Sequence, residues 1–217
     1  MKTLNLFLLF ALVCITATSC SKKIVGSGVV AQEERTMSDT VDALDISSVV
    51  KVTVVQGEDA SIVVTADDNI FDEIITRVSG NRLVIDLEGG NYKDITAEVL
   101  ITMPNLERID HDGVSDTEVS GFEDLDELEI ESSGVGDIIM NGSADKLVLD
   151  YSGVGNFKGF SFEVGTLDLD FSGVGDIEIT ANDLIEGELD GVGDLEYKGY
   201  PTINVEDNGV GKIKNRN

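Results

Sequence analysis

Residues 131–140 read ESSGVGDIIM, and the phrase Ser-Gly-Val-Gly-Asp at the centre of this stretch returns along the second half of the chain. Six recognisable copies occur at intervals of 18 to 21 residues, with their first glycine at Gly113, Gly134, Gly153, Gly173, Gly191 and Gly209. A period near 20 residues is typical of a solenoid in which each repeat stacks on the previous one.

Apolar residues stand at every second position on both sides of each phrase. In the copy at Gly173 they are Leu167, Leu169 and Phe171 before the glycine and Ile177 after it. Such alternation predicts strands with one buried face. Two short strands and a turn fill a repeat of this length without a helix. We therefore predict an all-β protein, a parallel β-helix with coils of 18–21 residues.

The glycines of the phrase are predicted to be structural. Glycine adopts positive φ at a corner without strain and lets a stacked coil approach closely. The aspartate or asparagine after the second glycine is expected to accept hydrogen bonds from nearby backbone N–H groups. The predicted turn glycines are Gly113, Gly134, Gly136, Gly153, Gly155, Gly173, Gly175, Gly191, Gly193, Gly209 and Gly211.

The composition excludes one class of partner. The 217 residues include 42 acidic and 15 basic ones, which gives a formal net charge of −27. Nucleic acid is not expected as a partner, because phosphate binding needs lysine and arginine. Cations and cationic surfaces remain compatible with this charge.

The N-terminus has the pattern of a bacterial lipoprotein signal. Residues 1–19 carry Lys2, then an apolar run and small residues before Cys20, as secretory signals do. The ending Ala-Thr-Ser-Cys resembles a lipobox, which implies that Cys20 carries the lipid and residues 20–34 form a tether to the membrane. An ordinary signal peptide is the alternative. Cleavage would remove Cys14, so no disulfide is expected within the mature chain.

Residues 35–104 are rich in predicted strands but lack the glycine phrase. We expect them to form an antiparallel β layer that caps the first coil, because an open coil end is an unpaired edge. Residues 105–217 are predicted to be the β-helix, with 35–217 as one continuous domain. Ser79-Gly80-Asn81 predicts a tight hairpin. Residues 67–75 predict one or two helical turns, capped by Asp67 or Asp68.

Several of these segments together resemble the DUF2807 family, described as a "putative auto-transporter adhesin, head GIN domain" and common in Bacteroidetes. The resemblance spans roughly residues 24–214 and implies a β-helical, envelope-anchored, non-enzymatic protein. Val stands between the glycines where that family usually has Ser. The matching features are the lipobox, Gly26–Val30, Arg35, Val52–Gly57, Ala66–Asn69, Ile101–Pro104 and the repeated Ser-Gly-x-Gly-Asp phrase.

No catalytic pattern stands out, and we predict that the protein is not an enzyme. The single histidine, His111, aligns with Tyr151 and Phe171 and is expected to be partly buried in the first coil. We expect an outer-membrane lipoprotein, facing the periplasm or the cell surface, that acts as an adhesin toward an unknown protein or glycan. Two alternatives stay open: a calcium-stabilised structural protein, and an acidic-site polysaccharide hydrolase or lyase.

One acidic position recurs three residues before each repeat glycine. Alternation points this position outward, so stacked coils would align the carboxylates in one stripe about 5 Å apart. Weak Ca²⁺ bridging along the stripe is one hypothesis, and a plain solvated face is the other; no further cofactor or metal site is predicted. The stripe residues are Asp110, Glu131, Asp150, Asp170, Glu188 and Glu206.

Overall fold

A computed structural model describes residues 23–47 and 49–217. The described strands form one sheet of 15 strands and a separate pair, β1 with β8. The predicted signal peptide and Cys20 lie outside the described residues. The strands are β1 (Lys23–Val25), β2 (Val30–Thr36), β3 (Ala43–Ile46), β4 (Lys51–Gln56), β5 (Ser61–Asp67), β6 (Ile74–Ser79), β7 (Arg82–Leu87), β8 (Asn91–Lys93), β9 (Ala97–Met103), β10 (Arg108–His111), β11 (Thr117–Ser132), β12 (Ile138–Tyr151), β13 (Phe157–Phe171), β14 (Ile177–Leu189), β15 (Leu195–Lys198), β16 (Thr202–Asp207) and β17 (Ile213–Asn215).

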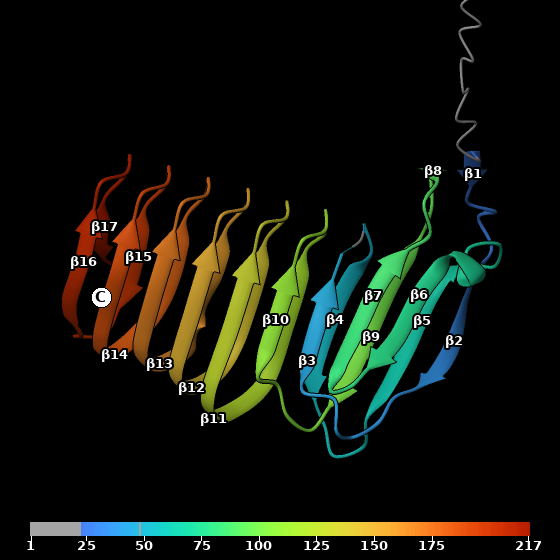
Figure 1. The fold of residues 1–217 in the computed structure, drawn as a ribbon, viewed down its shortest axis with the longest axis horizontal. Coiled ribbons are helices and arrows are strands. Elements are labelled where there is room, and N and C mark those ends of the chain that lie inside the picture. Colours follow the sequence, from blue (N-terminus) through green and yellow to red (C-terminus); the bar gives the residue numbers. More distant parts are fainter. Residues whose placement is uncertain (1–22, 48) are drawn as a thin grey trace, which may run out of the picture.

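The predicted β-solenoid is confirmed. From β10 to β15 each strand pairs in parallel with the strand or strands one coil later. The coils stack side by side along the long axis of the molecule (Figure 1). Each coil from β11 to β14 contains one long strand rather than the two short strands predicted. These strands bend where the pairing register shifts, and glycines with positive φ, such as Gly142 at 134°, lie in the bends. The ladder therefore continues from one face of the coil to the next.

The predicted antiparallel layer is present at the N-terminal end of the stack. Strand β5 pairs antiparallel with β2 and β9, and β6 forms the predicted hairpin with β7. Two strands of the same region, β3 and β4, instead pair in parallel with β10 and β11. The cap is thus joined to the solenoid through continuous hydrogen-bonded ladders.

The helix prediction near residue 70 is correct in place but wrong about its cap. A single 3₁₀ turn, η1 (Phe71–Glu73), follows Ile70, and no side chain caps it. The Asp67 carboxylate instead accepts hydrogen bonds from the backbone N–H groups of Gly28 (2.7 Å) and Thr96 (2.6 Å). Ile70 and Ile74 are buried, as expected for residues on one face.

The core consists of columns of side chains that stack from coil to coil. One column runs through His111, Ser132, Tyr151, Phe171 and Leu189, and all five side chains are buried. The rings of Tyr151 and Phe171 stack with centroids 6.0 Å apart. The interior is therefore continuous along the solenoid, and every coil depends on its neighbours for burial.

His111 is fully buried rather than partly buried. Its Nε2 lies 3.0 Å from the carbonyl oxygen of Ser115, so this nitrogen donates, and Nδ1 accepts from the Ser132 hydroxyl at 3.3 Å. Burial lowers the pKa of His111. The neutral ring is thus part of the core, and both of its nitrogens have hydrogen-bond partners.

Candidate functional site

The repeated phrase forms the same corner in each coil. A Cβ added at Gly153 or Gly173 would collide with the backbone carbonyl oxygen of the equivalent glycine one coil earlier. The second glycines differ, because Gly136, Gly155, Gly175 and Gly193 also have φ between +140° and +157°. Close approach of the neighbouring coil thus requires glycine at these first positions, and at these four second positions the backbone conformation requires it as well.

The residue after the second glycine forms a ladder along this corner. The Asp137 Oδ1 accepts from the backbone N–H of Asn156 (2.8 Å), and the Asn156 Oδ1 accepts from that of Asp176 (3.0 Å). Asp116, Asp176 and Asp194 make the same bond to the next coil. The donors are not in the same turn, where we expected them, but 18 to 21 residues later. The ladder therefore ties each coil to its successor.

Two lysines bind to this Asp/Asn ladder. Lys158 Nζ lies 2.5 Å from Asp137 Oδ2, and Lys214 Nζ pairs with Asp194. Burial alone would raise the pKa of Asp137, but the bonds from Lys158 and Asn156 lower it below its usual value. The hydrogen bond from Lys214 lowers the pKa of Asp194. The outer carboxylate oxygens of the ladder thus accept cationic groups.

The predicted acidic stripe lies in register on one outer face. Parallel pairing places its six residues on successive strands from β10 to β16, and Asp45 of β3 extends the row by one coil. Its first two members are neutralised by arginine, as described below. Within the described residues, no three His, Cys, Asp or Glu side chains are arranged to hold a metal ion. Calcium bridging of neighbouring rungs stays a prediction.

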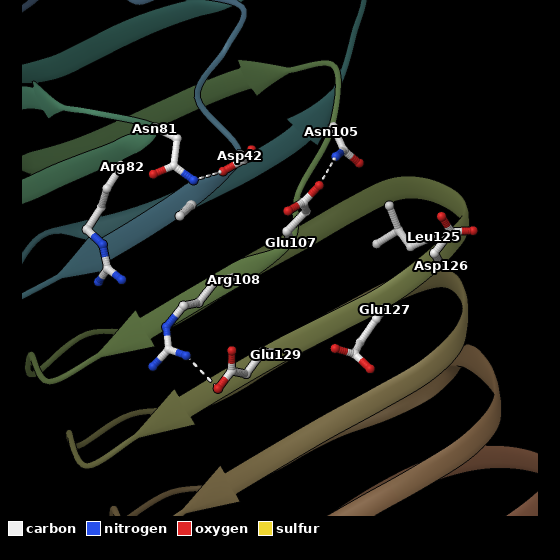
Figure 2. Close-up of a pocket in the computed structure, with 11 residues that line it drawn as sticks. Asp42, Asn81, Arg82, Asn105, Glu107, Arg108, Leu125, Asp126, Glu127 and Glu129 are labelled. Atoms are coloured by element: carbon white, nitrogen blue, oxygen red, sulfur yellow. Dashed lines mark hydrogen bonds and ion pairs between the residues drawn. The ribbon is translucent and has the colours of Figure 1, made fainter.

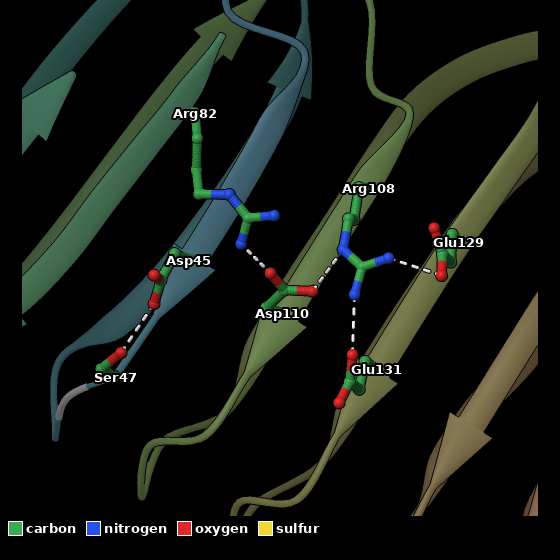
Figure 3. A network of polar contacts seen from close by, with 7 residues as sticks. All are labelled: Asp45, Ser47, Arg82, Arg108, Asp110, Glu129 and Glu131. Carbon is green, nitrogen blue, oxygen red and sulfur yellow. Dashed lines mark hydrogen bonds and ion pairs between the residues drawn. The ribbon is translucent and has the colours of Figure 1, made fainter. Parts of the chain in front are cut away.

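A charge network that the sequence did not reveal joins the cap to the solenoid. Asp110 accepts from Arg108 Nε at 2.6 Å and pairs with Arg82 of β7. Arg108 also reaches Glu129 at 2.5 Å and Glu131 at 2.7 Å (Figure 3). These acids lie on β10 and β11. Two arginines thus compensate the carboxylates where the cap hairpin meets the first coils.

A cavity of about 390 Å³ lies beside this network (Figure 2). Its amides are bound to its own acids: Asn81 donates to Asp42 at 2.6 Å, and Asn105 donates to Glu107 at 3.0 Å. Asp126 and Glu127 line the opposite side. The lining is polar and lacks aromatic side chains. Several charges of the cavity are therefore already paired, and the cavity has no aromatic side chain on which a sugar ring could stack.

The middle of the acidic stripe is predicted to lower stability at neutral pH. Burial raises the pKa of Asp150, and the charges of Asp170 and Glu131 raise it further. Because the pKa of Asp150 is higher in the folded state than in the unfolded state, the protonated carboxyl stabilises the fold. This stabilisation is complete below the unfolded pKa of 3.8 and is lost as pH rises through the folded pKa. Asp150→Asn should therefore raise Tm at pH 7 by about 1–2 °C, with no gain at pH 3.

The matched control for this change is Asp59→Asn, in the loop between β4 and β5 and off the stripe. Calorimetric melts of the three proteins at both pH values provide the measurement. An Asp150→Asn protein that gains nothing at pH 7, or gains equally at pH 3, would show that repulsion along the stripe does not act on stability.

The fold and surface define an all-β solenoid that displays rows of like side chains from stacked coils. The sequence model of the family DUF2807, "Putative auto-transporter adhesin, head GIN domain", matches residues 41–201. The chain belongs to this family. A search of the curated proteins finds no match.

Solved structures share the fold over most of the chain. A "putative adhesin" from Bacteroides fragilis is 26% identical with a TM-score of 0.74, and the alignment covers 89% of this chain and all of that one. A "putative adhesin" from Parabacteroides distasonis is 18% identical, with a TM-score of 0.60 and coverage of 90% and 100%. A "putative lipid binding protein" from the same species is 19% identical, with a TM-score of 0.56 and the same coverage.

Proposed function

We propose that the protein is a lipid-anchored, non-enzymatic adhesin of the bacterial cell envelope. The description of the family and the name of the B. fragilis relative support the adhesin assignment. The lipobox supports the anchor on Cys20. No helix among the described residues is long and apolar enough to cross a membrane.

The observation that carries this proposal is the direction in which the coils stack relative to the N-terminus. Strand β1, three residues after Cys20, pairs with β8 at the cap end of the solenoid, and β17 lies at the opposite end (Figure 1). A lipid on Cys20 would therefore hold the cap end near the membrane. The coils would extend away from it and present their long outer faces to a partner.

The chemistry of the described residues supports binding rather than catalysis. His111 is buried with both ring nitrogens satisfied, so it is not available to a substrate. The polar cavity near Arg108 holds acids that are bound to amides and arginines. The hydrolase or lyase alternative gains no support from this arrangement.

The proposal predicts that anchoring and adhesion depend on Cys20. Cells expressing Cys20→Ala should lose the protein from the outer-membrane fraction and adhere less to immobilised mucin than wild-type cells. Cys14→Ala, inside the predicted signal peptide, is the matched control and should behave as wild type. Surface proteolysis of intact cells then distinguishes a periplasmic from an external position.

Two results would contradict separate parts of the proposal. Membrane-bound Cys20→Ala protein would exclude the lipid anchor at this residue. Equal adhesion of wild-type cells and cells lacking the protein, across mucin and immobilised matrix proteins, would count against the adhesin assignment.

A further inference from the structure

A row of six exposed valines runs along the corner of the solenoid. Each valine directly follows the first glycine of its phrase, and successive valines pair in parallel from coil to coil. Their exposed fractions lie between 46% and 70%, so the row is an apolar ridge on the outside of a highly acidic protein. The valine ridge consists of Val114, Val135, Val154, Val174, Val192 and Val210.

The ridge is rigid. The backbone N–H of Val154 donates to the Gly134 carbonyl at 2.9 Å, and its carbonyl accepts from Gly136 at 2.9 Å. The same bonds recur at Val174 and Val192. Valine has one side-chain torsion, and its branching restricts it. Covering the ridge would remove apolar surface from water at little conformational cost.

The flanks of the ridge carry acids. The Asp/Asn ladder runs along one side, and Lys158 and Lys214 are bound to it. On the other side Asp112 and Asp190 stand near the two ends, with exposed serines between them. If two copies of the chain met through their valine ridges, the acids beside one ridge would repel the acids beside the other. Charge complementarity favours a partner with an apolar stripe bordered by lysine or arginine.

The spacing of the ridge favours a helix over a strand. Parallel strands are about 4.8 Å apart, so the five steps from Val114 to Val210 span about 24 Å. Helical side chains on one face repeat every three or four residues, about 4.5–6 Å. Alternate side chains of a strand repeat at about 6.6 Å and would lose register with the valines. A helix of about 16 residues matches the length of the ridge.

The N-terminal end of the ridge opens into a cavity. Val114 lines a hollow of about 290 Å³ together with Val49, Leu87 and Tyr92. Val49 is 52% exposed. This hollow could take one large apolar side chain from the end of a helix, and it would fix the direction of that helix along the ridge.

We propose that the valine ridge is a docking surface for a cationic amphipathic α-helix of a partner protein. The helix would lie along the solenoid with its apolar face on the valines and its lysines or arginines beside the Asp/Asn ladder. This inference rests on the proposed function, since it names the class of partner that the displayed module would bind.

The test uses the purified chain without its signal peptide and synthetic peptides of about 18 residues. One peptide places leucine at helical spacing and lysine elsewhere, the second is a scrambled sequence of the same composition, and the third replaces leucine by glutamine. Fluorescence anisotropy should give binding to the amphipathic peptide at least ~10-fold tighter than to either control. Equal affinities would reduce the interaction to non-specific charge attraction and overturn the proposal.

The matched variants locate the site. Val135→Ser, Val154→Ser and Val174→Ser together should weaken peptide binding at least ~10-fold, while Val30→Ser, Val78→Ser and Leu100→Ser, exposed apolar positions away from the ridge, should not. Thermal melts verify that both triple variants are folded. Unchanged binding by the ridge variant would refute the docking surface. The assay needs neither membrane nor cells. A negative result would therefore refute helix docking without contradicting the proposed lipid anchor or the proposed adhesion.

Discussion

Gly173→Ala is expected to destabilise the protein by about 3–4 kcal/mol, which lowers Tm by about 10 °C for a chain of this size. The added Cβ would collide with the Gly153 carbonyl oxygen and lie 3.1 Å from the carbonyl carbon of Ser152. This backbone cannot move aside easily, because Val174 donates to the same carbonyl at 2.9 Å. The two coils would have to separate at this corner.

The control for this change is Gly89→Ala, where a Cβ meets no atom within 4 Å. Its Tm should match that of the wild type. Hydrogen exchange adds a positional readout, because solenoid coils stabilise their nearest neighbours. Protection should fall in β14 to β17 before it falls in β10 to β12. A Gly173→Ala protein that melts within about a degree of wild type would refute the close-packed corner.

Phe171→Ala is expected to produce a loss of similar size, about 3–5 kcal/mol. The ring is 1% exposed, and it stacks on Tyr151 inside the column that continues to Leu189. Its removal leaves a cavity inside coils whose backbones are hydrogen-bonded to the coil before and the coil after. Because the ladders prevent collapse, little of the lost contact can be recovered.

The comparison for Phe171→Ala is Val174→Ala, three residues later and half exposed. Denaturant unfolding should place the midpoint of Phe171→Ala well below that of wild type and leave Val174→Ala near it. Comparable losses in both variants would mean that the ridge valines contribute to stability as core residues do. That result would also remove the basis for assigning them to partner binding.

Much of the architecture follows from local patterns in the sequence. Period-2 alternation around residues such as Leu167 and Leu169 predicts a buried strand face, because successive side chains point to opposite sides of a strand. The recurrence of the glycine phrase every 18–21 residues predicts stacked coils. The same alignment predicts that the acids three residues before each glycine share one outer face. All these relations depend on spacing along the chain.

Other features depend on contacts between coils or between the cap and the solenoid. Asp137 bonds to the backbone of Asn156 rather than within its own turn, and the sequence does not specify which of several N–H groups an aspartate reaches. Arg82 and Arg108 meet at Asp110 only because β3 lies between β7 and β10. The bend that joins two predicted strands into one coincides with shifts in the pairing register between neighbouring coils, which the sequence does not specify.

The sequence by itself determined the solenoid, its glycine corners and the acidic stripe. Each of them follows from the periodicity of the chain and from the conformational properties of single residue types. The tertiary structure decided that the valine ridge stays exposed, that His111 is fully buried and that two lysines bind the Asp/Asn ladder. Exposure and pairing depend on which atoms of distant residues meet across adjacent coils, and no local pattern encodes those distances.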